Sequence, residues 1–83
     1  MEDALVVGAT VEEVDIIDLK EAISNTDKAD IKTVYENLMK GSRNHLRSFV
    51  SNMKSRGYSY SPQYLNQEEF DEIVNSQIET GKN

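Results

Sequence analysis

Residues 11–19, VEEVDIIDL, decide the fold, because their apolar positions follow a helical spacing that continues on both sides. Apolar side chains recur every three or four residues and form one stripe, whose members are Leu5, Ala9, Ile16, Leu19 and Ile23. Glu12 interrupts this stripe at its centre. Residues 2–24 contain no proline and one glycine, so we predict a single helix over residues 3–24. Further valines and isoleucines lie off the stripe, which is typical of a helix that contacts neighbours on several sides.

A second long helix is predicted over residues 29–55, ending at Gly57. Its apolar stripe consists of Ile31, Val34, Leu38, Phe49 and Met53, and His45 lies inside it. The connection at residues 25–28 is short, so the second helix must fold back antiparallel to the first.

The segment after Gly57 combines tyrosines with turn residues. Residues 58–66, YSYSPQYLN, are too aromatic for a disordered linker and too rich in serine and proline for a helix, so we expect them to lie across the hairpin. Asn66 followed by Glu69 forms a capping-box pattern, which predicts a short third helix over residues 67–77. The predicted fold class is therefore all-α: one domain over residues 1–83, made of an antiparallel helix hairpin and a short C-terminal helix.

Length and composition limit the classes of protein that fit. A chain of 83 residues buries a small share of its surface, and the absence of cysteine excludes disulfides and thiolate metal sites. A partner chain, or a metal bound by oxygen and nitrogen, is the remaining source of stability. The sequence contains no apolar run long enough to cross a membrane and does not start like a signal peptide, so we expect a soluble protein.

Charge is divided along the chain. Residues 1–26 hold seven acids and one lysine, residues 27–57 hold seven bases and three acids, and residues 58–83 hold five acids and one lysine. This division favours packing of the basic middle segment beside the acidic ones. The cations of the second helix, Lys40, Arg43, Arg47 and Lys54, are expected on its outward side. With a net charge of −6, nucleic-acid binding is not expected.

Glu12 and His45 are the candidate site residues, because each stands where a buried apolar side chain would be expected. A carboxylate and an imidazole that project inward from facing helices can bind a metal in a helix bundle. They can equally hydrogen-bond to each other without a metal. Glu13 and Asp15 are weaker candidates, because both are expected to point sideways, where acids are solvated or paired. No nucleophile or phosphate-loop motif is present.

Four strings carry a family resemblance: residues 11–19 (VEEVDIIDL), 35–38 (YENL), 41–47 (GSRNHLR) and 60–65 (YSPQYL). Together and in this order, they resemble an uncharacterised ferritin-like family of bacteria and archaea, known as domain of unknown function 2202. The resemblance covers almost the whole chain, but it matches only the second half of the family's domain.

The resemblance implies half of a ferritin-like four-helix bundle, in which each helix pair supplies a Glu and a Glu-x-x-His to a metal centre. Glu12 then matches the lone carboxylate, with Glu13 as the fallback, and His45 matches the histidine. The chain departs from the pattern at Ser42, where the family pattern has Glu. This loss counts against a di-iron centre of the usual composition.

The leading hypothesis is therefore a ferritin-like metal-binding domain, or a C-terminal fragment of one, holding iron or another divalent metal for redox or storage chemistry in its parent protein. The expected partners are a second copy of the chain, as a homodimer, or missing N-terminal helices of the same protein. The rival hypothesis is a metal-free helical dimerisation or interaction module. Catalysis by this chain is left open by the sequence.

Overall fold

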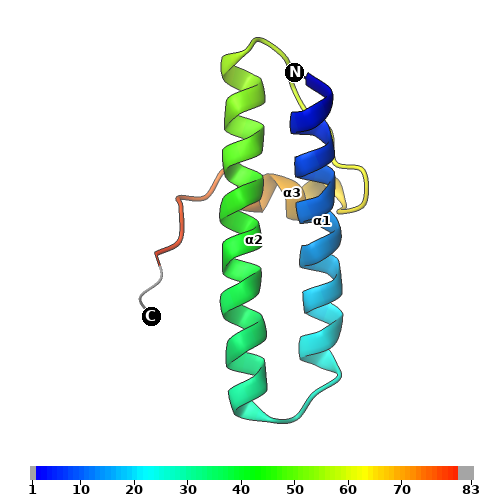
Figure 1. The fold of residues 1–83 in the computed structure, drawn as a ribbon, viewed down its shortest axis with the longest axis vertical. Coiled ribbons are helices and arrows are strands. Elements are labelled where there is room, and N and C mark those ends of the chain that lie inside the picture. The colour runs from blue at the N-terminus through cyan, green and yellow to red at the C-terminus, as the bar shows by residue number, and fades with distance from the viewer. Residues whose placement is uncertain (1, 81–83) are drawn as a thin grey trace.

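The computed structural model describes residues 2–80 and contains, within them, three helices and no strand. Helix α1 spans Glu2–Ser24 and α2 spans Ala29–Ser55, and the two run antiparallel as a hairpin (Figure 1). Helix α3, Gln67–Val74, crosses behind the hairpin. The all-α prediction is confirmed.

α3 is shorter than the predicted range of residues 67–77, because it ends at Val74. Its carbonyl at Ile73 accepts a hydrogen bond of 2.7 Å from the Nε of Arg47 on α2. The chain then leaves the helix and passes along α2 (Figure 1). The helix start agrees with the capping box, since the Asn66 side chain accepts from the Glu69 amide at 2.8 Å.

Residues 58–66, which we call the strap, connect α2 to α3. The strap follows Gly57, whose φ of 92° is a left-handed conformation that favours glycine. Tyr60 and Leu65 of the strap are buried, whereas Tyr64 is exposed. The strap is thus ordered by side chains that it inserts under α1 and α2.

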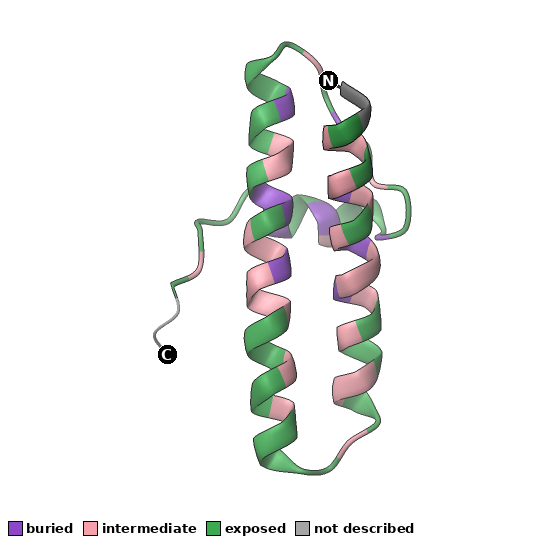
Figure 2. Ribbon diagram, in the orientation of Figure 1, coloured by how far each residue is buried: buried purple, intermediate pink, exposed green. Residues whose placement is uncertain are grey.

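The core lies where the hairpin meets the strap and α3. Its buried apolar members are Ala9, Ile16, Leu46, Met53, Tyr60, Leu65, Phe70 and Ile73. Figure 2 shows that burial is confined to one part of the hairpin. The prediction that Ile31, Val34 and Leu38 belong to a buried stripe is wrong, because no residue of 29–41 is buried. The buried core lies further along the hairpin, so Ile31, Val34 and Leu38 stay accessible.

Across residues 2–80, no helix is both long enough and apolar enough to cross a membrane.

Candidate functional site

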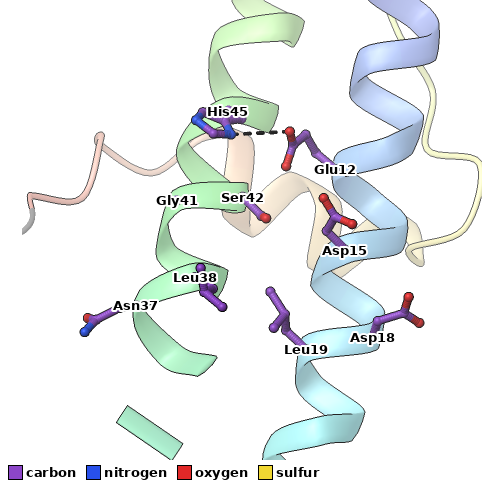
Figure 3. A pocket seen from close by; sticks show the side chains of 9 residues that line it. All are labelled: Glu12, Asp15, Asp18, Leu19, Asn37, Leu38, Gly41, Ser42 and His45. Atoms are coloured by element: carbon purple, nitrogen blue, oxygen red, sulfur yellow. Dashed lines mark ion pairs between the residues drawn. The ribbon is translucent and has the colours of Figure 1, made fainter. Parts of the chain in front are cut away.

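The hairpin has one covered side and one open side. We call the open face the side away from α3, where the groove between α1 and α2 is accessible. Part of it forms a cavity of about 560 Å³, and Figure 3 shows the side chains that line this part. Leu19 and Leu38 face each other across the cavity, while Glu12, Asp15, Ser42 and His45 supply polar atoms to it.

Glu12 and His45 meet across the open face. The Oε2 atom of Glu12 lies 3.3 Å from the Nδ1 atom of His45 (Figure 3). The Glu12 side chain is only 14% exposed, and its Oε1 atom is buried with no hydrogen-bond partner among the described residues. A buried carboxylate oxygen without a donor is unfavourable, so this atom is suited to a ligand that brings positive charge or a proton.

His45 is not buried, contrary to the sequence-based expectation. Its side chain is 67% exposed. His45 directly precedes the buried Leu46 in α2. Neighbouring residues of a helix point in different directions, so the imidazole of His45 lies outside the core and faces the open face. The ring is therefore accessible to a ligand or a partner.

Glu13 corrects a second expectation, because it is fully buried and does not lie at the side of the helix as a solvated or surface-paired acid. Its carboxylate accepts a hydrogen bond from the Tyr60 hydroxyl. It also accepts hydrogen bonds from three consecutive backbone amides of the strap, at 3.0 Å from Gln63, 2.8 Å from Tyr64 and 2.8 Å from Leu65.

Burial would raise the pKa of Glu13, but the hydrogen bonds from Tyr60 and the three amides lower it below its ordinary value. The carboxylate is thus held ionised with its acceptor sites in use. Burial, together with the contact to Glu13, raises the pKa of Tyr60 to about 12, so its hydroxyl stays a donor. Glu13 therefore anchors the strap and is unsuited to metal ligation. The four groups that bind Glu13, which we call the cradle, all belong to residues 60–65, the YSPQYL string of the sequence.

The remaining candidates contribute little to a metal site by themselves. Asp15 is half-buried at the cavity wall, and Asp18 is exposed. Ser42 is buried and points its hydroxyl toward the cavity (Figure 3). Among the described residues, no group of three or more His, Asp or Glu side chains is arranged to hold a metal ion. Glu12 and His45 fit a divalent metal in donor type but not in number.

Arg47 was expected on the outward side of α2, and this is wrong, because it is buried against α3 and the chain beyond it. Besides the Ile73 carbonyl, its guanidinium contacts the Asn44 side chain at 2.7 Å and the Glu79 carboxylate at 2.9 Å. The sequence signal that was missed is the acidic residue near the C-terminus, which pairs with this cation.

The fold is that of an all-helical protein in which the strap and α3 cover one side of a helix hairpin and leave the other side open. The chain belongs to the family of the uncharacterised protein domain DUF2202, whose model matches residues 1–77. It is 57% identical over 81 residues to the uncharacterised protein MJ0754 of Methanocaldococcus jannaschii, an alignment that covers 98% of this chain and 44% of the relative.

A crystal structure of the hypothetical protein MJ0754 has the same fold over the shared part, with a TM-score of 0.91 and 56% identity. The match covers 95% of this chain and 45% of that one. The chain thus spans less than half the length of the relative that it matches.

Proposed function

We propose that this hairpin is half of a ferritin-like helix bundle and that it binds a divalent metal through Glu12 and His45 when a second hairpin covers the open face. The observation that carries the proposal is the position of these two side chains. A carboxylate with an unpartnered buried oxygen and an accessible imidazole face the same groove from two different helices.

The nature of the donors supports a metal such as iron. Imidazole and carboxylate are common ligands of divalent transition metals, and helix bundles bind such metals with side chains that project inward from facing helices. Since this chain offers two such donors, the other ligands must come from the second hairpin. When bound, the metal would supply redox or storage chemistry. Glu12 and His45 would orient it, and Ser42 would be a polar neighbour in the position where the family pattern has Glu.

The second hairpin is, in this proposal, another copy of the chain or N-terminal helices of the same protein. Val34 and Leu38 on α2 are 56% and 55% exposed, and Val7 and Val11 of α1 are also exposed. Leu38 lines the groove, and exposed apolar side chains such as these are stabilised when another helix pair covers them. A two-fold axis through the open face would bring two Glu12 and two His45 side chains together.

The test is metal binding by the purified chain. Protein prepared without chelators is loaded with Mn²⁺, Zn²⁺ or, without oxygen, Fe²⁺, and bound metal is measured by elemental analysis after gel filtration. We expect a fixed metal-to-chain ratio for the wild type and loss of that metal in Glu12→Gln and His45→Ala. Asp18→Asn is the matched control, because it removes an acid that lines the same cavity but is exposed.

Equal metal content in the wild type and in both site variants would contradict the proposal. So would the absence of metal from all of them at a protein concentration at which the chain is shown to be paired with a second hairpin.

A metal-free interaction module is the second candidate, and it is favoured by the Glu12 to His45 contact, which exists without any metal. In that case the two side chains would hydrogen-bond to each other within the assembled bundle. Association of hairpins would then be unchanged by chelators, whereas the metal-binding proposal expects chelators to weaken it.

A further inference from the structure

In the chain after α3, Glu79 makes several hydrogen bonds and ion pairs to α2. We call residues 75–80 the tail. The tail residue Ile78 leaves its apolar side chain 59% exposed, so it is not a hydrophobic anchor. Glu79, in contrast, contacts α2 through both its side chain and its main chain.

The side chain of Glu79 is bound by two arginines on α2. Arg43 donates from Nε and from a terminal nitrogen to the two carboxylate oxygens, each at 2.6 Å. Arg47 adds a contact of 2.9 Å to one of these oxygens. Parallel hydrogen bonds from one guanidinium fix both the position and the plane of a carboxylate. The arginines lower the pKa of Glu79 to about 2.

The main chain of Glu79 is bound by a single side-chain amide. Asn44 donates from Nδ2 to the Glu79 carbonyl at 2.7 Å and accepts from the Glu79 amide at 2.8 Å. The two hydrogen bonds resemble those that a strand edge offers to an added peptide, and they do not depend on side-chain identity. The ligand is thus recognised as an extended residue that carries a carboxylate.

The binding groups are ordered by the rest of the protein. Arg47 is 8% exposed, and it is held by the Ile73 carbonyl of α3 at the same time as it contacts the Asn44 oxygen. Its charge is permanent, so removal of Glu79 would leave a nearly buried cation without its carboxylate. Such a site favours the entry of another carboxylate.

We infer that Arg43, Asn44 and Arg47 form a binding site for a glutamate in an extended peptide, and that the tail occupies this site as an intramolecular ligand. The tail is attached to α3 by a few residues, so its binding benefits from a high effective concentration. An acidic segment of a partner protein that displaces the tail would dock on α2 outside the open face, independently of any metal.

The experiment uses the full chain with Glu79→Ala, which removes the carboxylate of the tail. The probe is an acetylated and amidated peptide of residues 76–80, SQIET, added to ¹⁵N-labelled protein. The NMR signals of the Arg43 and Arg47 Nε–H groups and of the Asn44 side-chain amide report on binding. Circular dichroism verifies that the helix content is unchanged.

We expect saturable shifts of these signals with a dissociation constant on the order of millimolar, and roughly tenfold weaker binding to the wild type, whose site is occupied. A peptide with glutamine in place of its glutamate should not bind, and Glu79→Ala combined with Arg43→Gln should not respond. Acetate is added in parallel to measure the contribution of a carboxylate alone.

The inference is overturned if the folded variant shows no saturable shift, or if acetate or the glutamine peptide shifts the signals as strongly as SQIET does. It is also overturned if the wild type binds the peptide as tightly as the variant, because the tail would then not occupy the site. None of these outcomes depends on metal binding by Glu12 and His45.

Discussion

Glu13 joins parts of the chain that are about 50 residues apart, since one carboxylate on α1 accepts hydrogen bonds from three amides of the strap and from Tyr60. The strap amides lie outside helices, so without this carboxylate the amide of the buried Leu65 would lose its acceptor in a site that water does not reach, and the amides of Gln63 and Tyr64 would lose theirs in a partly buried one. A side chain of this kind stabilises the fold although it carries a charge, because its hydrogen bonds replace those of water.

Replacement of Glu13 by glutamine is expected to lower the free energy of unfolding by about 3 kcal/mol, because an amide NH₂ would face donors in a buried site. Tyr60→Phe removes one donor and leaves the backbone amides satisfied, so it should cost less, about 2 kcal/mol. Urea denaturation followed by circular dichroism measures both. Equal stability of Glu13→Gln and the wild type would contradict the role assigned to the cradle.

The lowered pKa of Glu13 also predicts how the stability of the fold depends on pH. The pKa of Glu13 is lowered in the folded state, so its contribution is present above the ordinary carboxyl pKa and is lost as the pH falls through the lowered value. The wild type should therefore lose more stability on acidification below about pH 4.5 than Glu13→Gln does. The exposed Glu68 serves as the control position, since Glu68→Gln should leave the acid transition of the wild type unchanged.

For individual residues, the sequence identified Glu12 and Glu13 as candidates but did not show which of them is exposed to the open face and which is buried. Neighbouring helical positions differ by about 100° in direction, and whether Glu12 or Glu13 meets the core depends on where the strap runs. The strap path depends on long-range contacts that a periodic pattern does not contain. The meeting of Glu12 and His45 was predictable from the two stripes, whereas the exposure of His45 was not.

The helices themselves follow from local sequence. The spacing of apolar residues and the stop at Gly57 predicted α1 and α2 within a residue of the observed ends, and the Asn66 cap predicted the start of α3. The end of α3 was not predictable, because the Arg47 contact that closes it comes from another helix. The close approach of α1 to the Phe49 ring of α2 depends on the missing Cβ atom at Gly8.

Two glycines form a matched pair for testing this packing. A Cβ atom at Gly8 would lie 2.5 Å from the Phe49 ring, whereas a Cβ at Gly41 would meet nothing within 4 Å. Gly41→Ala should raise the stability of the chain by about 1 kcal/mol through helix propensity. Gly8→Ala should lower it by about 1 kcal/mol or more, because the ring must move. Thermal unfolding of both variants measures the difference.

The Phe49→Leu background supplies the control for the Gly8 result. A smaller side chain removes the collision, so Gly8→Ala should become less destabilising in this background. A Gly8→Ala cost that is the same with phenylalanine and leucine would show that the close approach of this ring is not its cause.

For the whole molecule, the most consequential feature is that the strap and α3 cover one side of the hairpin, while the tail runs beside α2 (Figure 1). The composition predicted a chain in need of a partner, and the structure leaves Leu38 accessible in the groove of the open face and Val7, Val11 and Val34 exposed. The sequence could not predict which side of the hairpin would remain uncovered, because α1 carries apolar residues on both of its faces.

Leu38→Glu should weaken association with a second hairpin without unfolding the chain. The side chain is 55% exposed, so the stability of the isolated chain should change by less than about 0.5 kcal/mol. A charge at this position would lose its hydration when a second hairpin covers the open face. Sedimentation equilibrium over a range of concentrations measures the effect, with and without the loading metal.

Ile78→Glu is the matched control, because it introduces the same charge at an exposed apolar residue of the tail. It should associate like the wild type. Equal weakening by both variants would indicate a general effect of net charge rather than an interface on the open face.

The cradle around Glu13 has a consequence for how the chain acquires its structure. The hairpin closes through the four residues between its helices and can form early, whereas the amides of residues 63–65 must wait for an acceptor located some 50 positions upstream. We therefore expect the strap to be immobilised after the hairpin has closed. Newly made hairpins would expose both flanks at first, and only the later arrival of the strap makes one flank different from the other.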